Sequence, residues 1–184
     1  MNKINFENIP LDKEVYTFEI DDILYEKKDY VLQIYYLFAN FVEYTEGRPL
    51  AHAVLDFMKS HYEQSGEELV LEKTLAHFGL GDQYIEQFGR LYANGQLPLK
   101  LFLVDPTKEF LQKLTSLGKK ICILTKGNPV MQLNKLKHLD WQGLDKNIKV
   151  FFVDELLFRK LNPITYLAQD YQVNENDLVN VADF

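Results

Sequence analysis

Residues 15–25 read Val-Tyr-Thr-Phe-Glu-Ile-Asp-Asp-Ile-Leu-Tyr, an apolar run that breaks into acids. The β-branched and aromatic residues at its start predict a buried strand. Glu19 and Asp21 stand two positions apart, so their side chains would point the same way on an extended backbone. Two close carboxylates need a cation or a shared proton, and ligands of α/β sheets bind at the carboxyl ends of strands. The stretch therefore predicts a ligand or metal site, with a solvated acidic loop as the alternative.

The rest of the chain predicts an α/β fold with a helical insertion. Apolar residues recur at helical spacing through residues 26–98, which indicates an all-helical segment. From residue 99 onward, helices and strands alternate, and that order implies a parallel sheet. We therefore expect a Rossmann-like core formed by residues 1–25 and 99–184, with a helical cap at 26–98.

The individual elements follow from the same patterns. We expect helices at 49–62, 68–78, 82–92, 107–117, 129–139 and 163–171, and strands at 120–124, 148–153 and 178–181. The only cysteine, Cys122, lies inside one of these apolar strands, which favours a buried structural thiol over a reactive one.

Composition and charge exclude several function classes. The chain has 184 residues, 47% of them apolar, with 13 Phe and 11 Tyr, so a substantial core is possible. A net charge of −7 argues against nucleic acid or an anionic membrane as the main partner. The amino-terminal residues show no signal peptide, and no stretch reaches the ~20 apolar residues of a membrane span. We expect a cytoplasmic protein, while the oligomeric state stays open.

Polar residues also follow the strand predicted at 120–124. Thr125-Lys126-Gly127 begins a strand-to-helix turn, where a hydroxyl and backbone amides can donate hydrogen bonds to a phosphate. An ordinary turn that caps the next helix is the alternative.

Two later positions complete the candidate site. Lys160 precedes a predicted helix, where a cation is unfavourable unless an anion lies nearby or the side chain is solvated. Asp183 follows the last predicted strand, directly after Val181 and Ala182.

These segments together resemble the four motifs of the haloacid dehalogenase (HAD) superfamily of phosphohydrolases. The first motif there is an apolar strand followed by Asp-x-Asp-x-Thr-Leu, and Asp21, Asp22, Leu24 and Tyr25 match its later part. Thr125 resembles the second motif, Lys160 with Pro163 the third, and Asp183 the fourth. The resemblance covers the whole chain, and the helical insertion matches the position of the cap in many HAD phosphatases.

The resemblance implies a role for each position. Glu19 would stand at the nucleophile and Asp21 at the general acid, while Thr125, Lys126, Gly127 and Lys160 would bind the phosphoryl group. Mg²⁺ would be held by the side chains of Glu19 and Asp183 and by the backbone carbonyl of Asp21. The implied function is a Mg²⁺-dependent phosphatase that acts on a small phosphorylated metabolite.

The sequence departs from the family at the reacting atom. Glu19 replaces the nucleophilic Asp, and Ile23 replaces the Thr of the first motif. The extra methylene displaces the carboxylate by about 1.5 Å, and a misplacement of ~1 Å can reduce a rate about a hundredfold. We therefore expect weak or no phosphatase activity. The alternatives are a catalytically inactive HAD-like domain that binds a phosphorylated ligand or a protein partner, and a dehalogenase, which Glu19 suits no better.

Overall fold

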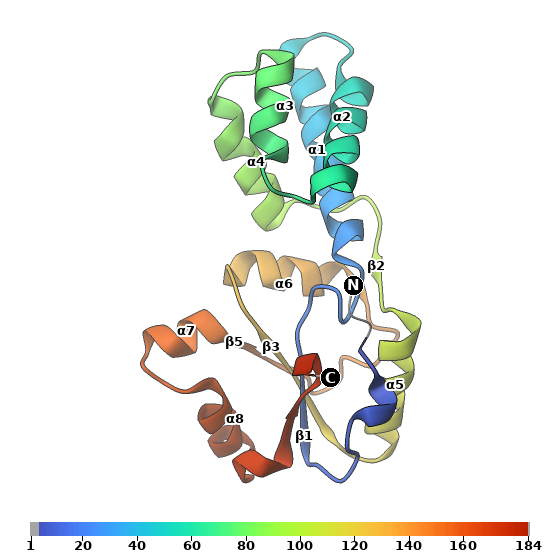
Figure 1. Ribbon diagram of the computed structural model, residues 1–184, viewed down its shortest axis with the longest axis vertical. Helices are drawn as coiled ribbons and strands as arrows, with labels where there is room; N and C mark the ends of the chain where they lie inside the picture. Colours follow the sequence, from blue (N-terminus) through green and yellow to red (C-terminus); the bar gives the residue numbers. More distant parts are fainter. Residues whose placement is uncertain (1–3, 184) are drawn as a thin grey trace. The chain divides into compact units, whose positions relative to one another are not determined.

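The chain forms two compact units in a computed structural model that describes residues 4–183. One unit contains the residues up to Lys27 together with those from Lys100 onward, and the other is Lys28–Leu99 (Figure 1). The first unit is α/β and the second is helical.

The α/β unit is built on a four-stranded parallel sheet. Its strands are β1 (Val15–Phe18), β3 (Lys120–Thr125), β5 (Lys149–Phe152) and β6 (Leu178–Asn180), in the order β5-β3-β1-β6. Every neighbouring pair is parallel, so the four carboxyl ends lie along one edge. The predicted α/β class with a parallel sheet is confirmed.

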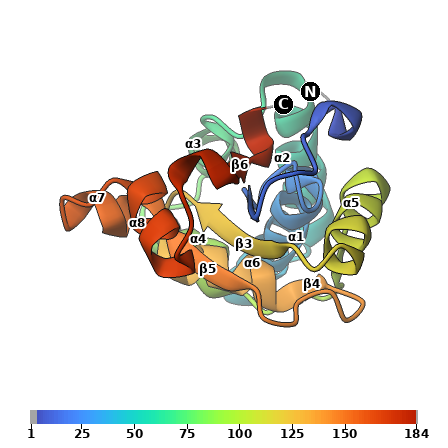
Figure 2. The same ribbon diagram turned by 90° about the horizontal axis from the view of Figure 1, so that it is seen from below.

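Helices cover both faces of this sheet, because successive side chains of each strand point to opposite sides. On one face, the ring of Phe110 from α5 (Asp105–Ser116) packs on Tyr16 and Phe18 of β1. On the other face, Val15 of β1 clusters with Leu167 of α8 (Pro163–Tyr171). Figure 2 shows α5 and α8 on opposite sides of the strands.

The structure adds elements that the sequence did not predict. A short helix, α7 (Val153–Phe158), follows β5, so the strand expected at 148–153 ends one residue earlier. A separate two-stranded parallel pair joins β2 (Leu101–Phe102) to β4 (Leu139–Asp140). The strand expected at 178–181 also ends early, and its last residue begins the 3₁₀ turn η3 (Val181–Asp183). Two further 3₁₀ turns are η1 (Phe6–Asn8) and η2 (Glu175–Asp177).

The helical unit packs around an aromatic core. Its helices are α1 (Lys27–Glu46), which begins in the last residue of the α/β unit, α2 (Ala51–Ser65), α3 (Val70–Phe78) and α4 (Gln83–Asn94). Phe38 of α1 is fully buried and makes edge-to-face contacts with Tyr84 and Phe88 of α4. Such pairs add to the stabilisation that burial gives. Among the residues that the structure describes, no helix has the length and apolar character needed to span a bilayer.

Candidate functional site

The candidate site lies where β1 and β3 end. Phe18 of β1 pairs in register with Ile123 of β3, so Glu19 follows one strand next to the last residues of the other. Thr125 is the final residue of β3 and is buried. The parallel arrangement therefore brings these two predicted site residues together, although 106 positions separate them.

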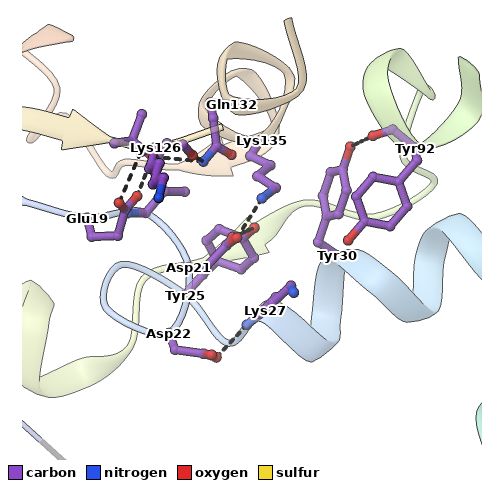
Figure 3. A network of polar contacts seen from close by, with 12 residues as sticks. Glu19, Asp21, Asp22, Tyr25, Lys27, Tyr30, Tyr92, Lys126, Gln132 and Lys135 are labelled. Atoms are coloured by element: carbon purple, nitrogen blue, oxygen red, sulfur yellow. Dashed lines mark hydrogen bonds and ion pairs between the residues drawn. The ribbon is translucent and has the colours of Figure 1, made fainter. Parts of the chain in front are cut away.

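Glu19 binds the end of β3 directly, through both carboxylate oxygens. The Thr125 hydroxyl donates a hydrogen bond to Oε1, and the Lys126 backbone amide donates one to Oε2 at 3.2 Å (Figure 3). The Ile20 amide also donates to Oε1, at 2.8 Å. Hydrogen bonds to an ionised carboxylate are stronger than neutral ones, so these donors hold Glu19 firmly in place.

The next donor of the same turn is also taken by a carboxylate. The Gly127 amide donates to Oδ2 of Asp154 at 2.8 Å, and Asp154 lies in the first turn of α7. Gly127 has a φ of +106°, a conformation that a residue with a side chain would adopt only with strain. Thr125, Lys126 and Gly127 therefore form a row of anion-binding donors, and the chain's own Glu19 and Asp154 occupy that row.

Helix α6 (Pro129–His138) supports this turn from the other side. Asn128 caps the helix, with its side-chain oxygen accepting from the Val130 amide at 2.9 Å. Gln132 then reaches back, and its Nε2 donates to the Thr125 hydroxyl at 2.8 Å and to the Lys126 carbonyl at 2.7 Å. Because the Thr125 hydroxyl accepts from Gln132, its proton is directed to Glu19.

Asp21 has a different set of partners. Its Oδ2 lies 2.6 Å from Nζ of Lys135, and its Oδ1 accepts from the Tyr25 hydroxyl at 2.6 Å (Figure 3). The side chain of Lys135 is 1% exposed and that of Asp21 is 24% exposed. Asp21 and Glu19 were expected to lie close, with a cation or a shared proton to relieve their repulsion, and the structure instead gives each carboxylate its own donors.

A tight turn separates the two acids. The Leu24 amide donates to the Ile20 carbonyl at 3.0 Å, and Asp22 adopts a left-handed conformation with a φ of +62°. The Thr107 hydroxyl of α5 fixes the turn by donating to the Ile23 carbonyl at 2.5 Å. The chain therefore leaves the extended conformation after β1, which is why the two-residue spacing does not bring both carboxylates to the same partner.

The two remaining predicted residues lie elsewhere in this unit. Lys160 is exposed, follows the end of α7 and has a φ of +58°. Asp183 lies in η3, where its Oδ1 accepts from Nδ2 of Asn180 at 2.9 Å. The described contacts join neither residue to Glu19, so their proposed phosphate and metal roles stay predictions.

The acids present do not form a set of metal ligands. Mg²⁺ needs oxygen ligands in octahedral geometry, and the predicted set was Glu19, Asp21 and Asp183. Across residues 4–183, no three His, Cys, Asp or Glu side chains come together to hold a metal. Of the two predicted side-chain ligands, Glu19 accepts from the end of β3 and Asp183 accepts from Asn180. The side chains in this arrangement therefore do not fit Mg²⁺.

Sequence reasoning missed three of the residues that organise this site: Gln132, Lys135 and Asp154. Gln132 and Lys135 are three positions apart and therefore share one face of α6. Both are buried, whereas Val130 and Leu133 of the same helix are about half exposed (54% and 50%). The buried face of α6 therefore combines these polar residues with the apolar Leu136, and hydropathy alone does not select it. Asp154 lies in α7, and its role could have been predicted only if that helix had been predicted first. No apolar periodicity indicated α7.

Cys122 lies in β3, three residues before Thr125. It is fully buried in the cluster with Val15 and Leu167, and burial raises the pKa of its thiol to about 12. The thiol is therefore neutral and structural, as predicted.

Comparisons with known proteins bear on the fold. No protein-family profile matches the chain, and no curated protein sequence does. An L-2-haloacid dehalogenase structure aligns over 92% of this chain and 77% of its own, with a TM-score of 0.51 and 14% identity. A proposed beta-phosphoglucomutase from Thermotoga maritima aligns over 91% of this chain and 74% of its own, with a TM-score of 0.50 and 18% identity.

The chain therefore has the fold of the HAD superfamily, as the four motifs predicted. At these identities, the likeness shows the fold alone. Any activity has to be argued from the residues of the site.

Proposed function

We propose that this chain has a HAD-like hydrolase fold but no effective hydrolase activity, and that it functions by binding a protein partner. The observation that carries the proposal is the contact of Glu19 with the end of β3. The hydroxyl of Thr125 and the amide of Lys126, which the resemblance assigns to phosphoryl binding, donate instead to the Glu19 carboxylate.

This contact opposes catalysis in two ways. A nucleophilic carboxylate must direct an oxygen at phosphorus, and the Glu19 carboxylate is instead directed at the end of β3, where both of its oxygens accept hydrogen bonds. A developing phosphoryl charge also needs preorganised donors, and these donors already hold an anion of the chain. A phosphate ester would have to displace Glu19 from Thr125 and Lys126 before it could bind.

The same geometry favours a protein partner over a phosphorylated ligand. A phosphate at this turn would meet the negative charges of Glu19 and Asp154, which occupy the donors of residues 125–127. In the same unit, the adjacent side chains of Leu157 and Phe158 are 54% and 89% exposed at the end of α7. Exposed apolar side chains of this kind supply contact area in protein interfaces.

A weak Mg²⁺-dependent phosphatase acting on a small phosphorylated metabolite is the second candidate. It is favoured by the convergence of Thr125 and Lys126 on the residue that stands in the nucleophile position. In that case, the substrate would displace the Glu19 carboxylate from its donors and then be attacked by it.

Hydrolysis of p-nitrophenyl phosphate and a panel of small phosphate esters, with Mg²⁺, separates the two candidates. The wild type would be assayed beside Glu19→Asp, which shortens the carboxylate, and Glu109→Asp, the same change at an exposed position of α5. We expect no turnover by the wild type or by Glu109→Asp. Activity in Glu19→Asp alone would show that Glu19 is the residue that prevents hydrolysis. No activity in any of the three proteins would show that other residues prevent it as well. Turnover by the wild type that EDTA abolishes would overturn the proposal in favour of the phosphatase.

A further inference from the structure

We propose that a pocket in the helical unit binds the primary ammonium group of an organic ligand. The pocket has a volume of about 360 Å³ and is lined by residues of α1, of α4 and of the segment that begins α3. All of these residues belong to the helical unit. The inference therefore goes beyond the proposed function, which concerns residues of the α/β unit.

Aromatic rings form much of the pocket wall. Tyr35, Phe88 and Tyr92 line it, and the ring centroid of Phe88 lies 6.2 Å from that of Tyr35 and 5.8 Å from that of Tyr92. The faces of aromatic rings carry negative partial charge and attract cations. Leu69 lines the same pocket with a side chain that is 53% exposed. A mainly apolar wall with a few polar groups is typical of small-molecule sites.

The charged residues of the pocket are all acidic. Glu67 and Glu72 line it, and no lysine, arginine or histidine is among the described residues that do so. The amino end of α3 lies between these two glutamates in sequence and contributes about half a positive charge. Two carboxylates exceed that charge, so the pocket favours a cation over an anion.

The Tyr35 hydroxyl is the second, independent observation. Tyr35 is 1% exposed, and its hydroxyl has no hydrogen-bond partner among residues 4–183. Burial raises the pKa of Tyr35, and the charge of Glu67 adds to this effect, so the hydroxyl stays protonated at neutral pH. A buried hydroxyl without a partner is costly, and a polar group of a ligand in the pocket would supply that partner.

A primary ammonium group suits all of these features. It has three N–H donors, which can be shared between the Tyr35 hydroxyl and a carboxylate, and its charge suits the aromatic rings. A quaternary ammonium has no N–H to donate to Tyr35, and Glu67 and Glu72 would repel a carboxylate ligand. The alkyl part of the ligand would contact Leu69.

Isothermal titration of the full chain with three ligands of one shape tests the inference. n-Butylammonium chloride, butan-1-ol and sodium butyrate differ mainly in charge, and we expect a Kd of about 1 mM for the first, as suits so few atoms. The alcohol and the acid should bind at least tenfold more weakly. No saturable binding of n-butylammonium, or equal binding of the alcohol or the acid, would overturn the inference.

Variants of the lining residues locate the binding. We expect Tyr35→Phe and Glu67→Gln each to weaken n-butylammonium binding at least fivefold, while Glu68→Gln, at an adjacent exposed position outside the pocket, binds as the wild type. Tyr35→Phe removes a hydroxyl that has no partner, so its thermal unfolding midpoint should not fall. Wild-type affinity in both pocket variants, or an equal loss in Glu68→Gln, would overturn the inference.

The ammonium group could belong to a small amine or to a lysine side chain of a protein. N-acetyl-lysine methylamide carries the same butylammonium group on a peptide backbone, and titration with it distinguishes the two sources. Tighter binding than that of n-butylammonium would assign the pocket to a lysine side chain, and weaker binding would assign it to a free amine.

Discussion

Glu19 and Thr125 are 106 residues apart in sequence and are joined by a direct hydrogen bond from the threonine hydroxyl to the Glu19 carboxylate. The bond forms because β1 and β3 are parallel neighbours, so the residues that end them meet at one edge of the sheet. In the HAD motifs that this chain resembles, the first position attacks the phosphoryl group and the second binds its oxygens. Here they bind each other, and this contact is the basis of the predictions for the site.

Removing the Thr125 hydroxyl should destabilise the α/β unit. Thr125→Val keeps the side-chain shape but leaves Nε2 of Gln132 and Oε1 of Glu19 each with one partner fewer. Both groups keep one other partner, so the cost is that of the two lost hydrogen bonds, one of them to a charged group, and we expect a loss of about 1–3 kcal/mol in urea unfolding. Thr115→Val is the control, since Thr115 is exposed on α5, and its effect should stay within about 0.5 kcal/mol. Equal effects of the two variants would contradict the network.

The Asp21–Lys135 pair should show strong coupling in a double-mutant cycle. Breaking a buried pair by removing one partner costs roughly 3–5 kcal/mol, so Lys135→Met alone should be strongly destabilising. Adding Asp21→Asn should recover a large part of that loss, because the unpaired charge is then gone. The exposed pair of Lys149 and Asp170 should couple by less than about 1 kcal/mol in a parallel cycle. Comparable coupling in both cycles would show that Lys135 is not a specific partner of Asp21.

Cys122 should make stability fall at alkaline pH. Burial raises the pKa of its thiol from the usual 9.0 to about 12, so the neutral form is favoured in the native state. Stabilisation from a raised pKa is complete below the unfolded value and is lost as the pH rises through the window from 9.0 to about 12. The free energy of unfolding of the wild type should therefore decrease across this window more steeply than that of Cys122→Ala.

The same residue gives a direct chemical readout, since it is the only cysteine. A thiol reagent should leave the native protein unmodified at about pH 8 and react fully after denaturation. Rapid labelling of the native protein would contradict the buried, structural role of Cys122.

The helical unit should depend on its aromatic core. Phe38 is fully buried against Tyr84 and Phe88, so Phe38→Ala should cost about 3–5 kcal/mol of stability. Tyr44 lies on the same helix and is 88% exposed, and Tyr44→Ala should have an effect below about 0.5 kcal/mol. Thermal unfolding followed by circular dichroism measures both variants, and a similar midpoint for the two would contradict the packing.

The fold could be predicted from the sequence because the spacing of apolar residues indicates the helices and strands and their order. The apolar run at 15–18 and the alternation of helices and strands after residue 99 predicted the parallel sheet that is observed. The order of the elements also made Glu19 and Thr125 neighbours, since adjacent parallel strands end at one edge. α7 was missed because its six residues are too few for a helical pattern to show.

The partners in the site could not be predicted in the same way. A hydrogen bond depends on side-chain direction, and the turn after β1 sends Asp21 to Lys135 and not toward Glu19. Lys135 and Gln132 are polar residues on the buried face of α6, while the apolar Val130 and Leu133 of the same helix are half exposed. A sequence pattern that ranks positions by apolar character cannot find a buried cation that is stabilised by one specific carboxylate.

The most direct test of the central claim is isothermal titration with inorganic phosphate, applied to the wild type, Glu19→Ala and Glu19→Gln. The account predicts no saturable binding tighter than about 10 mM in the wild type and a gain of at least tenfold in Glu19→Ala, which frees the Thr125 and Lys126 donors. Glu19→Gln removes the charge but keeps an oxygen in reach of those donors, so its gain should be clearly smaller. Phosphate binding by the wild type as tight as by Glu19→Ala would contradict the claim that Glu19 occupies the anion site.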